Sequence, residues 1–454
     1  MTNSFLAFAY LLSSILFIFS IRGLASPETA RRGNLLGMLG MAVAILATLF
    51  SPLVNEYVWV AGAILLGGIL GTIPALKVKM TSLPQMVAAF NGLGGLSSVF
   101  IAIAEILAGS QTYLETSLGL LIGALAFSGS VIAFAKLQGL ISARAMVFPL
   151  QQTLNLLLGL AVVGLCAWFV ISGDRNIFYA LAVLSILLGF LLILPIGGAD
   201  MPVVISVLNS YSGLAAVGIG FSLNNVLLIT VGSLVGASGA ILSYIMTKAM
   251  NRSLANVMLG GFGAKTAAAS NLADEDKQAH AGSPADAAFI MENANKVIIV
   301  PGYGMAVAQA QHVLKEMADD LHNKFGVEVK YAVHPVAGRM PGHMNVLLAE
   351  ANVPYEEVFE LEDINREFAT ADVAYVIGAN DVTNPMAKTN PDSPIYGMPI
   401  LDVEKAKTVF FVKRSLATGY SGVENPLFYA DNTIMLYGDA KKVTEEIVNV
   451  LENK

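Results

Sequence analysis

The stretch Lys296-Val-Ile-Ile-Val-Pro-Gly-Tyr-Gly-Met-Ala-Val, residues 296–307, decides the fold of the second half of the chain. Its apolar run predicts a buried β-strand that leads directly into a Gly-x-Gly turn, and we predict a helix over residues 305–325. Gly302 permits the tight turn, and Gly304 lets the backbone approach a pyrophosphate at a helix start. Alone this is a weak signal, because Val307 stands where a third Gly or Ala is usual.

Short apolar runs alternate with helical patterns downstream of this turn. The predicted strands cover residues 327–333, 374–378, 408–413 and 433–437, and the predicted helices cover residues 341–351 and 439–452. Strands separated by helices favour parallel pairing. We therefore predict an α/β doubly wound parallel sheet of the Rossmann-like type.

The strand ends indicate which dinucleotide such a sheet would bind. Sites for NAD usually carry an Asp or Glu at the end of the second strand, but here that strand ends in Ala332-Val-His-Pro. The strand over residues 408–412 instead ends in Lys413, Arg414 and Ser415, at the edge where ligands of such sheets bind. A basic pair at a strand end is often only solvated. Combined with the glycine turn, it favours the extra 2′-phosphate of NADP(H).

Two loops after predicted strands have unusual composition. His334-Pro-Val-Ala-Gly-Arg-Met-Pro-Gly-His places Arg339 between two Gly/Pro turns. Gly378-Ala-Asn-Asp places Asp381 at a carboxyl-terminal strand edge. Asp381 is either a loop or helix cap, or a carboxylate beside a nicotinamide that senses or exchanges a proton.

The first half of the chain has the composition of a membrane domain. Hydrophobic residues make up 55% of the chain and charged residues only 13%. Nine apolar runs are long enough to span a bilayer: 4–21, 34–53, 57–76, 84–108, 117–136, 146–171, 178–195, 201–221 and 225–247. Nine basic and six acidic residues lie before residue 251, against 17 and 27 beyond it. This pattern excludes a single soluble globule, a disordered acidic chain and a disulfide scaffold, and nucleic acid is not an expected partner.

Basic residues in the connections predict the orientation of the spans. They follow spans 1, 3 and 5, as Arg22, Arg31, Arg32, Lys77, Lys79, Lys136 and Arg144. These connections are therefore expected inside, with the N-terminus outside and the C-terminal half inside. The connection after span 7 has Asp200 and no basic residue, which is the weak point of the pattern.

Polar residues within the spans either hold the bundle together or line a path for a proton. Asn91, Ser98 and Glu105 are seven residues apart and share one helix face. Ser130 and Asn209 lie in two other spans. Interhelical hydrogen bonding is one interpretation, and a hydrated proton path with Asn91, Ser130 and Asn209 is the other. Small-residue pairs such as Gly67 with Gly71, Gly232 with Gly236, and Gly239 with Ser243 indicate close helix packing.

Composition changes again between the two halves. Residues 260–292 are rich in Ala, Gly, Ser and Asp and keep no apolar periodicity, which indicates a linker. We predict a transmembrane domain over residues 1–250, a linker over 251–292 and a nucleotide-binding domain over 293–454, for which the strand ends favour NADP(H).

Several motifs resemble one family when they are read together. They are Gly302-Tyr-Gly-Met-Ala-Val-Ala-Gln, His334-Pro-Val-Ala-Gly-Arg-Met-Pro-Gly-His-Met-Asn, Gly378-Ala-Asn-Asp, Lys413-Arg-Ser, Gly438-Asp-Ala-Lys, Gly197-Gly-Ala-Asp-Met-Pro and Leu208-Asn-Ser-Tyr-Ser-Gly. The chain resembles, over essentially its whole length, the β subunit of the proton-translocating NAD(P)+ transhydrogenase.

The resemblance implies an enzyme of the inner cell membrane. A partner α subunit would carry NAD(H), this chain would carry NADP(H), and two αβ units would pair within the membrane lipid. Hydride would pass from NADH to NADP+, driven by protons that move inward.

The resemblance also implies site residues. Lys413, Arg414 and Ser415 would hold the 2′-phosphate, Asp381 would be the proton-sensitive acid, and residues 392–402 would form a mobile lid. A reversed nucleotide would remove the need for a third glycine. The implied NADP contacts are Gly302, Tyr303, Gly304, Met305, Ala306, Val307, Val336, Ala337, Gly338, Arg339, Met340, Pro341, Gly378, Ala379, Asn380, Asp381, Val382, Gly397, Met398, Lys413, Arg414, Ser415, Leu416, Ala417, Thr418, Gly419, Tyr420, Asp439 and Ala440.

This chain differs from some members of that family at the position proposed to bind the proton. Some members have a His in span 4 where this chain has Asn91, and an amide cannot store a proton near neutral pH. The acceptor would then be a water cluster, the Asp381 region or a group on the partner.

Two rival functions remain from other classes. One is an ion channel or transporter regulated by a nucleotide-binding domain. The other is a quinone-linked dehydrogenase, which would need flavin or iron–sulfur ligands. One cysteine, Cys166, cannot ligate a cluster, and no metal site is predicted.

Overall fold

Long apolar helices make up the first half of the chain, and an α/β layer makes up the second. The computed structural model describes residues 2–51, 54–142, 145–260, 279–393, 395–419 and 421–453. Within these residues the chain divides into two units. One comprises Met1–Ile196 with Val204–Ser243, and the other comprises Gly197–Val203 with Tyr244–Lys454.

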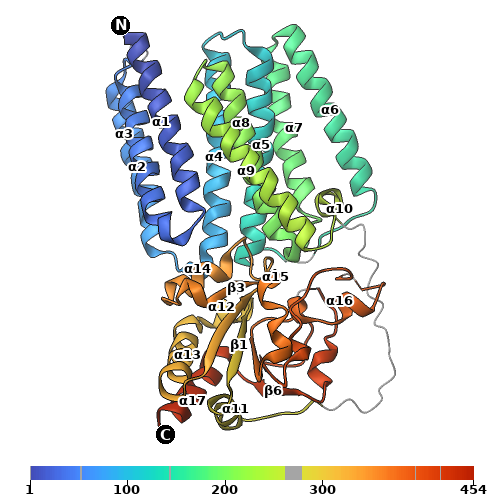
Figure 1. The fold of residues 1–454 in the computed structure, drawn as a ribbon. Coiled ribbons are helices and arrows are strands. Elements are labelled where there is room, and N and C mark those ends of the chain that lie inside the picture. The colour runs from blue at the N-terminus through green and yellow to red at the C-terminus, as the bar shows by residue number, and fades with distance from the viewer. Residues whose placement is uncertain are drawn as a thin grey trace. The chain divides into compact units, whose positions relative to one another are not determined.

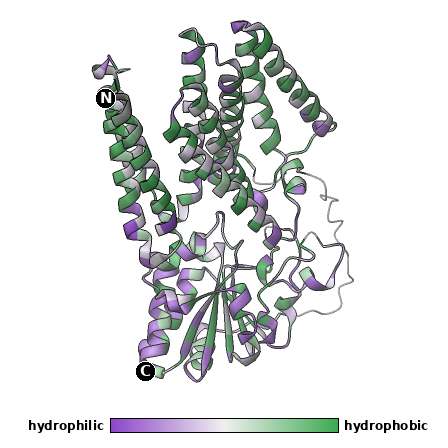
Figure 2. Cartoon of the chain, turned by 45° about the horizontal axis from the view of Figure 1, so that its top comes forward, coloured by the Kyte–Doolittle hydropathy of each residue, from purple (hydrophilic) through white to green (hydrophobic). Residues whose placement is uncertain are grey.

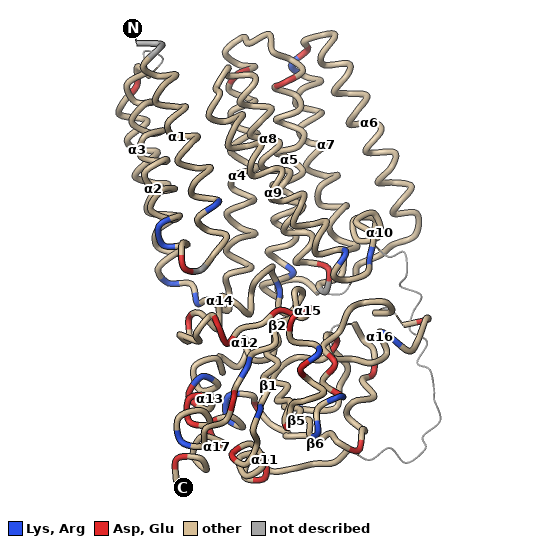
Figure 3. Tube along the Cα trace, in the orientation of Figure 1, with Lys and Arg blue, Asp and Glu red and all other residues tan. Residues whose placement is uncertain are grey.

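Nine helices among the described residues are long and apolar enough to cross a membrane, as the sequence predicts. They are α1 (Thr2–Leu24), α2 (Pro27–Leu49), α3 (Tyr57–Lys77), α4 (Leu83–Leu107), α5 (Tyr113–Gln138), α6 (Gln151–Ser172), α7 (Arg175–Ile193), α8 (Met201–Ser222) and α9 (Val226–Ala249) (Figure 1). Apolar residues cover their lengths (Figure 2), and the charged residues lie near their ends (Figure 3). The second and sixth spans differ most from the prediction, because α2 begins at Pro27 and α6 only at Gln151.

Glycines bring two helix pairs of the membrane unit into close contact. A Cβ atom at Gly95 of α4 would lie 2.6 Å from the Gly123 carbonyl of α5. A Cβ atom at Gly213 of α8 would lie 2.4 Å from the Gly236 nitrogen of α9. Close packing is thus confirmed for the α9 glycines. For Gly67 and Gly71 it stays a prediction, because no atom of the described part of this chain lies within 4 Å of such a Cβ.

Two buried polar groups near the ends of membrane helices make contacts with other segments. The buried Lys136 ammonium group donates to the carbonyls of Leu194 and Ile196, each at 2.6 Å, at the end of α7. In the second unit one guanidinium nitrogen of Arg252, Nη1, donates to both carboxylate oxygens of buried Asp200, at 2.6 and 2.8 Å. Asp200, in the connection after span 7 that has no basic residue of its own, is therefore paired with Arg252 from the segment that follows α9.

The second unit is built on a six-stranded parallel sheet, which confirms the predicted fold class. Its strands are β1 (Lys296–Pro301), β2 (Glu328–Val333), β3 (Val358–Glu360), β4 (Val373–Ile377), β5 (Thr408–Lys413) and β6 (Thr433–Tyr437). They lie in the order β3-β2-β1-β4-β5-β6, and every neighbouring pair is parallel. This is the order of the dinucleotide-binding doubly wound fold.

Alternate residues of β1 face two different core layers. Val297 and Ile299 pack with one cluster, and Ile298 and Val300 pack with the other. The first layer is formed by α11 (Pro284–Glu292), α12 (Tyr303–Ala308), α13 (Gln311–Phe325), α14 (His343–Glu350) and α17 (Ala440–Glu452). The second is formed mainly by shorter pieces, among them α15 (Leu361–Ile364), η4 (Glu367–Thr370), η6 (Val403–Lys405) and η7 (Pro426–Tyr429). The remaining short helices are α10 (Leu254–Leu259), α16 (Met386–Thr389), η1 (Met80–Ser82), η2 (Gly198–Asp200), η3 (Tyr355–Glu357) and η5 (Asp381–Thr383).

Three local features differ from the sequence prediction. The helix predicted over residues 305–325 is broken between α12 and α13, because Gln309 adopts a left-handed conformation with φ 54°. The short strand β3 lies in an acidic stretch that carries no clear strand pattern. Ordered packing also begins upstream of residue 293, since α11 buries Ala287 and Met291 against the sheet and Ala281 bridges Met435 of β6.

Candidate functional site

The strand order reverses between β1 and β4, and the loops that leave their carboxyl ends meet there. Ligands of open α/β sheets bind at such a reversal, outside the carboxyl ends of the strands. The Gly302 nitrogen donates to the Ile377 carbonyl at 2.9 Å, and the Gly304 nitrogen donates to the Gly378 carbonyl at 2.9 Å. The topology therefore places the glycine turn directly against the loop that carries Asp381.

The glycines of these two loops are required by the contact between the loops. A Cβ atom at Gly302 would lie 2.4 Å from the Gly378 carbonyl oxygen, and one at Gly304 would lie 2.7 Å from the Gly378 Cα. Gly378 itself has φ 70°, a backbone conformation that residues with a side chain rarely adopt. The Gly-x-Gly pattern thus has a structural reason here beyond the approach of a pyrophosphate.

The loop after β2 is organised by two buried histidines. His334 accepts from the Val336 nitrogen through Nδ1 at 3.2 Å, so its Nε2 donates to the Pro399 carbonyl at 2.7 Å. The Arg339 nitrogen donates to His343 Nδ1 at 3.1 Å. Burial lowers the pKa of His334 to about 4, and burial together with Arg339 lowers the pKa of His343 to about 4. Both rings are neutral at physiological pH.

Tyr303 and Arg339 are brought together beside the second of these histidines. The Arg339 guanidinium lies over the Tyr303 ring at 4.2 Å from its centre, and the rings of Tyr303 and His343 are 6.2 Å apart. Gly338, with φ 102°, gives His343 room, since a Cβ there would lie 2.6 Å from the His343 Cβ.

The loop after β4 holds Asp381 at the start of η5. The Asp381 carboxylate accepts from the Ser421 nitrogen at 2.9 Å and from the Ser421 hydroxyl at 2.7 Å. Asn380 is bound by Asn425, whose amide donates to the Asn380 side-chain oxygen at 3.1 Å. Asp381 is therefore bonded to a distant loop and is more than a local cap.

The loop after β5 presents the basic residues. Arg414 is exposed and its guanidinium donates to Asp439 at 2.8 Å, which unites two predicted contact segments. The Lys413 ammonium group lies over the Phe428 ring at 4.3 Å and donates to the Ala417 carbonyl. Burial lowers the pKa of Lys413, and the nearby Asp381 charge opposes that shift. Residues 414–418 are exposed at the carboxyl end of the sheet.

Two buried donors at this edge lack an acceptor among the residues that the structure describes. They are His343 Nε2, which carries the proton because Nδ1 accepts, and the Asn380 side-chain nitrogen. Buried donors without acceptors are costly, and a bound anion or amide could satisfy them. Together with exposed Arg414 and half-buried Lys413, they fit a phosphate-bearing nucleotide.

The segment predicted as a lid packs against the loop after β2. Buried Met398 and Ile395 share a small core with Val336, and Gly397 has φ 76°. Lys388 and Lys405 both pair with Asp402 at the end of this segment. Tyr420, another predicted contact, lies outside the described residues.

The membrane unit brings together some of the predicted polar residues. The Asn91 amide of α4 donates to the Ser130 hydroxyl of α5 at 2.9 Å. From α8, Ser212 reaches the Asn91 carbonyl at 3.4 Å, whereas half-buried Asn209 has no such contact among the hydrogen bonds of the described residues. At the far end of α4, Glu105 accepts from Thr116 at 3.3 Å.

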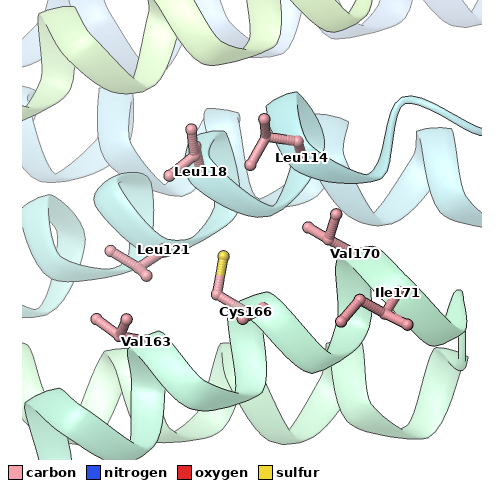
Figure 4. Close-up of a pocket in the computed structure, with 8 residues that line it drawn as sticks. Leu114, Leu118, Leu121, Val163, Cys166, Val170 and Ile171 are labelled. Atoms are coloured by element: carbon pink, nitrogen blue, oxygen red, sulfur yellow. The ribbon is translucent and has the colours of Figure 1, made fainter.

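A hollow of about 470 Å³ lies between α5 and α6. Figure 4 shows its apolar lining, with Leu118 and Leu121 of α5 opposite Val163 and Cys166 of α6. Cys166 is buried, as predicted. A lining without charged groups does not suit a nucleotide.

A family model described as NAD(P) transhydrogenase beta subunit matches residues 6–450. The chain belongs to this family. Two proteins of Rhodospirillum rubrum, each named NAD(P) transhydrogenase subunit beta, are 62% identical to it over 464 residues. Each match covers 99% of this chain and 100% of the relative.

Family membership establishes the general assignment. This transhydrogenase chain is a membrane subunit, the family uses NAD(H) and NADP(H), and the beta designation implies an alpha partner. It favours a transhydrogenase over a regulated channel or a quinone-linked dehydrogenase.

Several residues that organise this candidate site carry no sequence signal of their own. Ser421 and Asn425 bind the loop of Asp381 from about 40 positions away, and no motif marks them. His343 does have a sequence signal, because it ends the same Gly/Pro-rich motif as Arg339.

Proposed function

We propose that this chain is the NADP(H)-binding and membrane subunit of a proton pump that couples hydride transfer from NADH to NADP+ with inward proton movement. The observation that carries the proposal is the set of groups at the carboxyl edge of the sheet. Exposed Arg414, half-buried Lys413 and two buried donors without acceptors lie on the loops after β2, β4 and β5. Such a set suits a nucleotide with an additional phosphate.

Each loop has a distinct part in this proposal. Lys413, Arg414 and Ser415 would bind the 2′-phosphate, and Arg339 with Tyr303 would form one wall of the site. The buried donors of His343 and Asn380 would bind phosphate or amide oxygens. When bound, NADP+ supplies the nicotinamide that accepts a hydride, with its two electrons, from NADH held by the alpha partner.

Asp381 would take up and release the proton that is coupled to nucleotide binding. A carboxylate at the strand edge can change charge without a change of fold, and its two hydrogen bonds connect it to the loop of Lys413. In the membrane unit, Asn91 and Ser130 would position water along the proton path, with Asn209 on α8.

We further propose that the connections after α1, α3, α5 and α7 lie inside, with the N-terminus outside. Two contacts support one part of this proposal, that the ends of α5, α7 and α9 lie on the same side. Lys136 at the end of α5 binds carbonyls at the end of α7, and Arg252 after α9 pairs with Asp200 after α7. All three ends are expected on the inner side. We also propose residues 1–250 as the proton-translocating domain and a dimer of αβ units as the assembly.

The experiment is a comparison of nucleotide affinities on the full chain with its partner. Wild type is expected to bind NADP(H) far better than NAD(H) at this site. Lys413→Ala with Arg414→Ala should weaken NADP(H) binding by about 100-fold, because charge-assisted contacts are lost, and leave NAD(H) binding unchanged.

The matched control removes two positive charges at the other end of the sheet. Lys324→Ala with Lys407→Ala changes residues before β2 and β5, so NADP(H) affinity should stay that of wild type. Comparable wild-type affinities for NADP(H) and NAD(H) would refute the assignment of the 2′-phosphate.

A further inference from the structure

Both oxygens of the Asp381 carboxylate are held by one residue, Ser421. The Ser421 nitrogen donates to Oδ2 at 2.9 Å, and its hydroxyl donates to Oδ1 at 2.7 Å. The hydroxyl oxygen also accepts from the Val423 nitrogen at 3.3 Å. A chain of donors therefore runs from the backbone of residue 423 through the serine hydroxyl to the carboxylate.

Ser421 lies between an exposed part of the loop after β5 and a part that is hydrogen-bonded to the loop after β4. Residues 414–418, which follow the basic Lys413, are exposed. Residues 421–425 are bound to the loop after β4, since Asn425 donates to Asn380 and Asn384 donates to the Glu424 carbonyl at 3.0 Å. The serine is the member of this fixed segment that contacts the carboxylate.

The two donors of Ser421 respond differently when the charge of the carboxylate changes. Hydrogen bonds to an ionised carboxylate are shorter and about twice as strong as neutral ones. A backbone N–H can only donate a hydrogen bond, whereas a hydroxyl can also accept one from a protonated carboxyl group. The serine hydroxyl can therefore stay bonded to Asp381 in either protonation state, and alanine at this position could not.

We propose that Ser421 is a positioning residue for Asp381. The hydroxyl of Ser421 keeps the Asp381 carboxylate hydrogen-bonded to the loop that carries Lys413, Arg414 and Ser415. It acts through Asp381 and need not touch the nucleotide. This inference rests on the proposed function, because it takes Asp381 and the basic loop to be parts of an NADP(H) site.

The test compares Ser421→Ala with Ser421→Thr in the full chain with its partner subunit. Alanine removes one charge-assisted hydrogen bond, so the Kd for NADP(H) should rise about tenfold. Threonine keeps the hydroxyl and should restore wild-type affinity. Ser421→Cys, which keeps the size but only a weak donor, should lie between them.

Two further comparisons separate positioning from general stability. Thr370→Ala removes an exposed hydroxyl that donates to the Glu367 carbonyl at the other end of the sheet, and it should bind NADP(H) like wild type. In an Asp381→Asn background, Ser421→Ala should add less than twofold, because its partner is already changed.

The outcomes distinguish failure of the proposed role of Ser421 from failure of the proposed NADP(H) function. Unchanged affinity in Ser421→Ala, failure of threonine to rescue, or equal effects in both backgrounds would overturn the role of Ser421. If wild type itself shows no preference for NADP(H), the proposed function fails instead.

Discussion

Asp381 is the residue on which proton coupling depends in this proposal. It lies at the carboxyl end of β4, bonded to Ser421 and near Lys413. Asp381→Asn should slow proton-coupled hydride transfer by about 100-fold, because an amide cannot exchange a proton near neutral pH. The rate in proteoliposomes with the partner subunit measures this.

The control for this change is another carboxylate of the same unit. Asp431→Asn alters an exposed residue before β6 and should leave the rate unchanged. Co-purification with the partner checks that both variants assemble. A wild-type rate in Asp381→Asn would remove this residue from the mechanism.

The lowered pKa of buried His334 makes the stability of the second unit depend on pH. Its pKa is about 4 in the folded chain, against an ordinary value of 6.5. As the pH falls from 6.5 towards 4, the unfolded chain takes up a proton that the folded chain does not. The free energy of unfolding should therefore fall, by up to about 3 kcal/mol for this residue.

Thermal unfolding at pH 7.5 and pH 5 measures this effect. His334→Asn should lower the midpoint at both pH values, because the bond to the Pro399 carbonyl is lost, but it should reduce the difference between them. An equal difference in wild type and variant would show that His334 does not titrate as described.

At the scale of elements, the contact between α8 and α9 depends on missing side chains. A Cβ atom at Gly213 would lie 2.4 to 2.8 Å from backbone atoms of Gly232 and Gly236. Gly213→Leu should force the helices apart and destabilise the membrane unit by about 3 kcal/mol or more. The yield and thermal midpoint of the detergent-purified chain measure this.

A glycine without close neighbours provides the matched control. Gly164 of α6 has no atom within 4 Å of an added Cβ among the described residues, so Gly164→Leu should be tolerated. Equal loss in both variants would mean that the substitution acts through the helix itself and not through the contact.

The elements were predictable from sequence where their pattern is local. The nine spans and five of the six strands follow from apolar runs, but β3 has only three residues and lies among acidic ones. The break at Gln309 has no sequence signal, because the residues around it have the composition of a continuous helix. Contacts such as Asp381 with Ser421 join positions 40 residues apart, so the order of the strands must be known first.

At the scale of the whole molecule, the uneven charge of the sequence corresponds to two kinds of structure. The membrane unit has few charges, and these lie near helix ends, whereas the second unit carries most of the acidic residues around its sheet. Basic residues of this acidic unit include Lys413 and Arg414 on the loop after β5. The proposed NADP(H) site requires such local cations, because a 2′-phosphate needs positive charge that the net charge of the unit does not supply.

The most direct measurement follows hydride transfer and pH together. The chain and its alpha partner are reconstituted in proteoliposomes, and transfer from NADH to an NADP analogue is recorded with the pH on both sides of the membrane. We expect each to be coupled to the other: an inward proton gradient speeds hydride transfer, and hydride transfer alone moves protons inward. Hydride transfer at the same rate with and without a gradient, and without any change in pH, would contradict it.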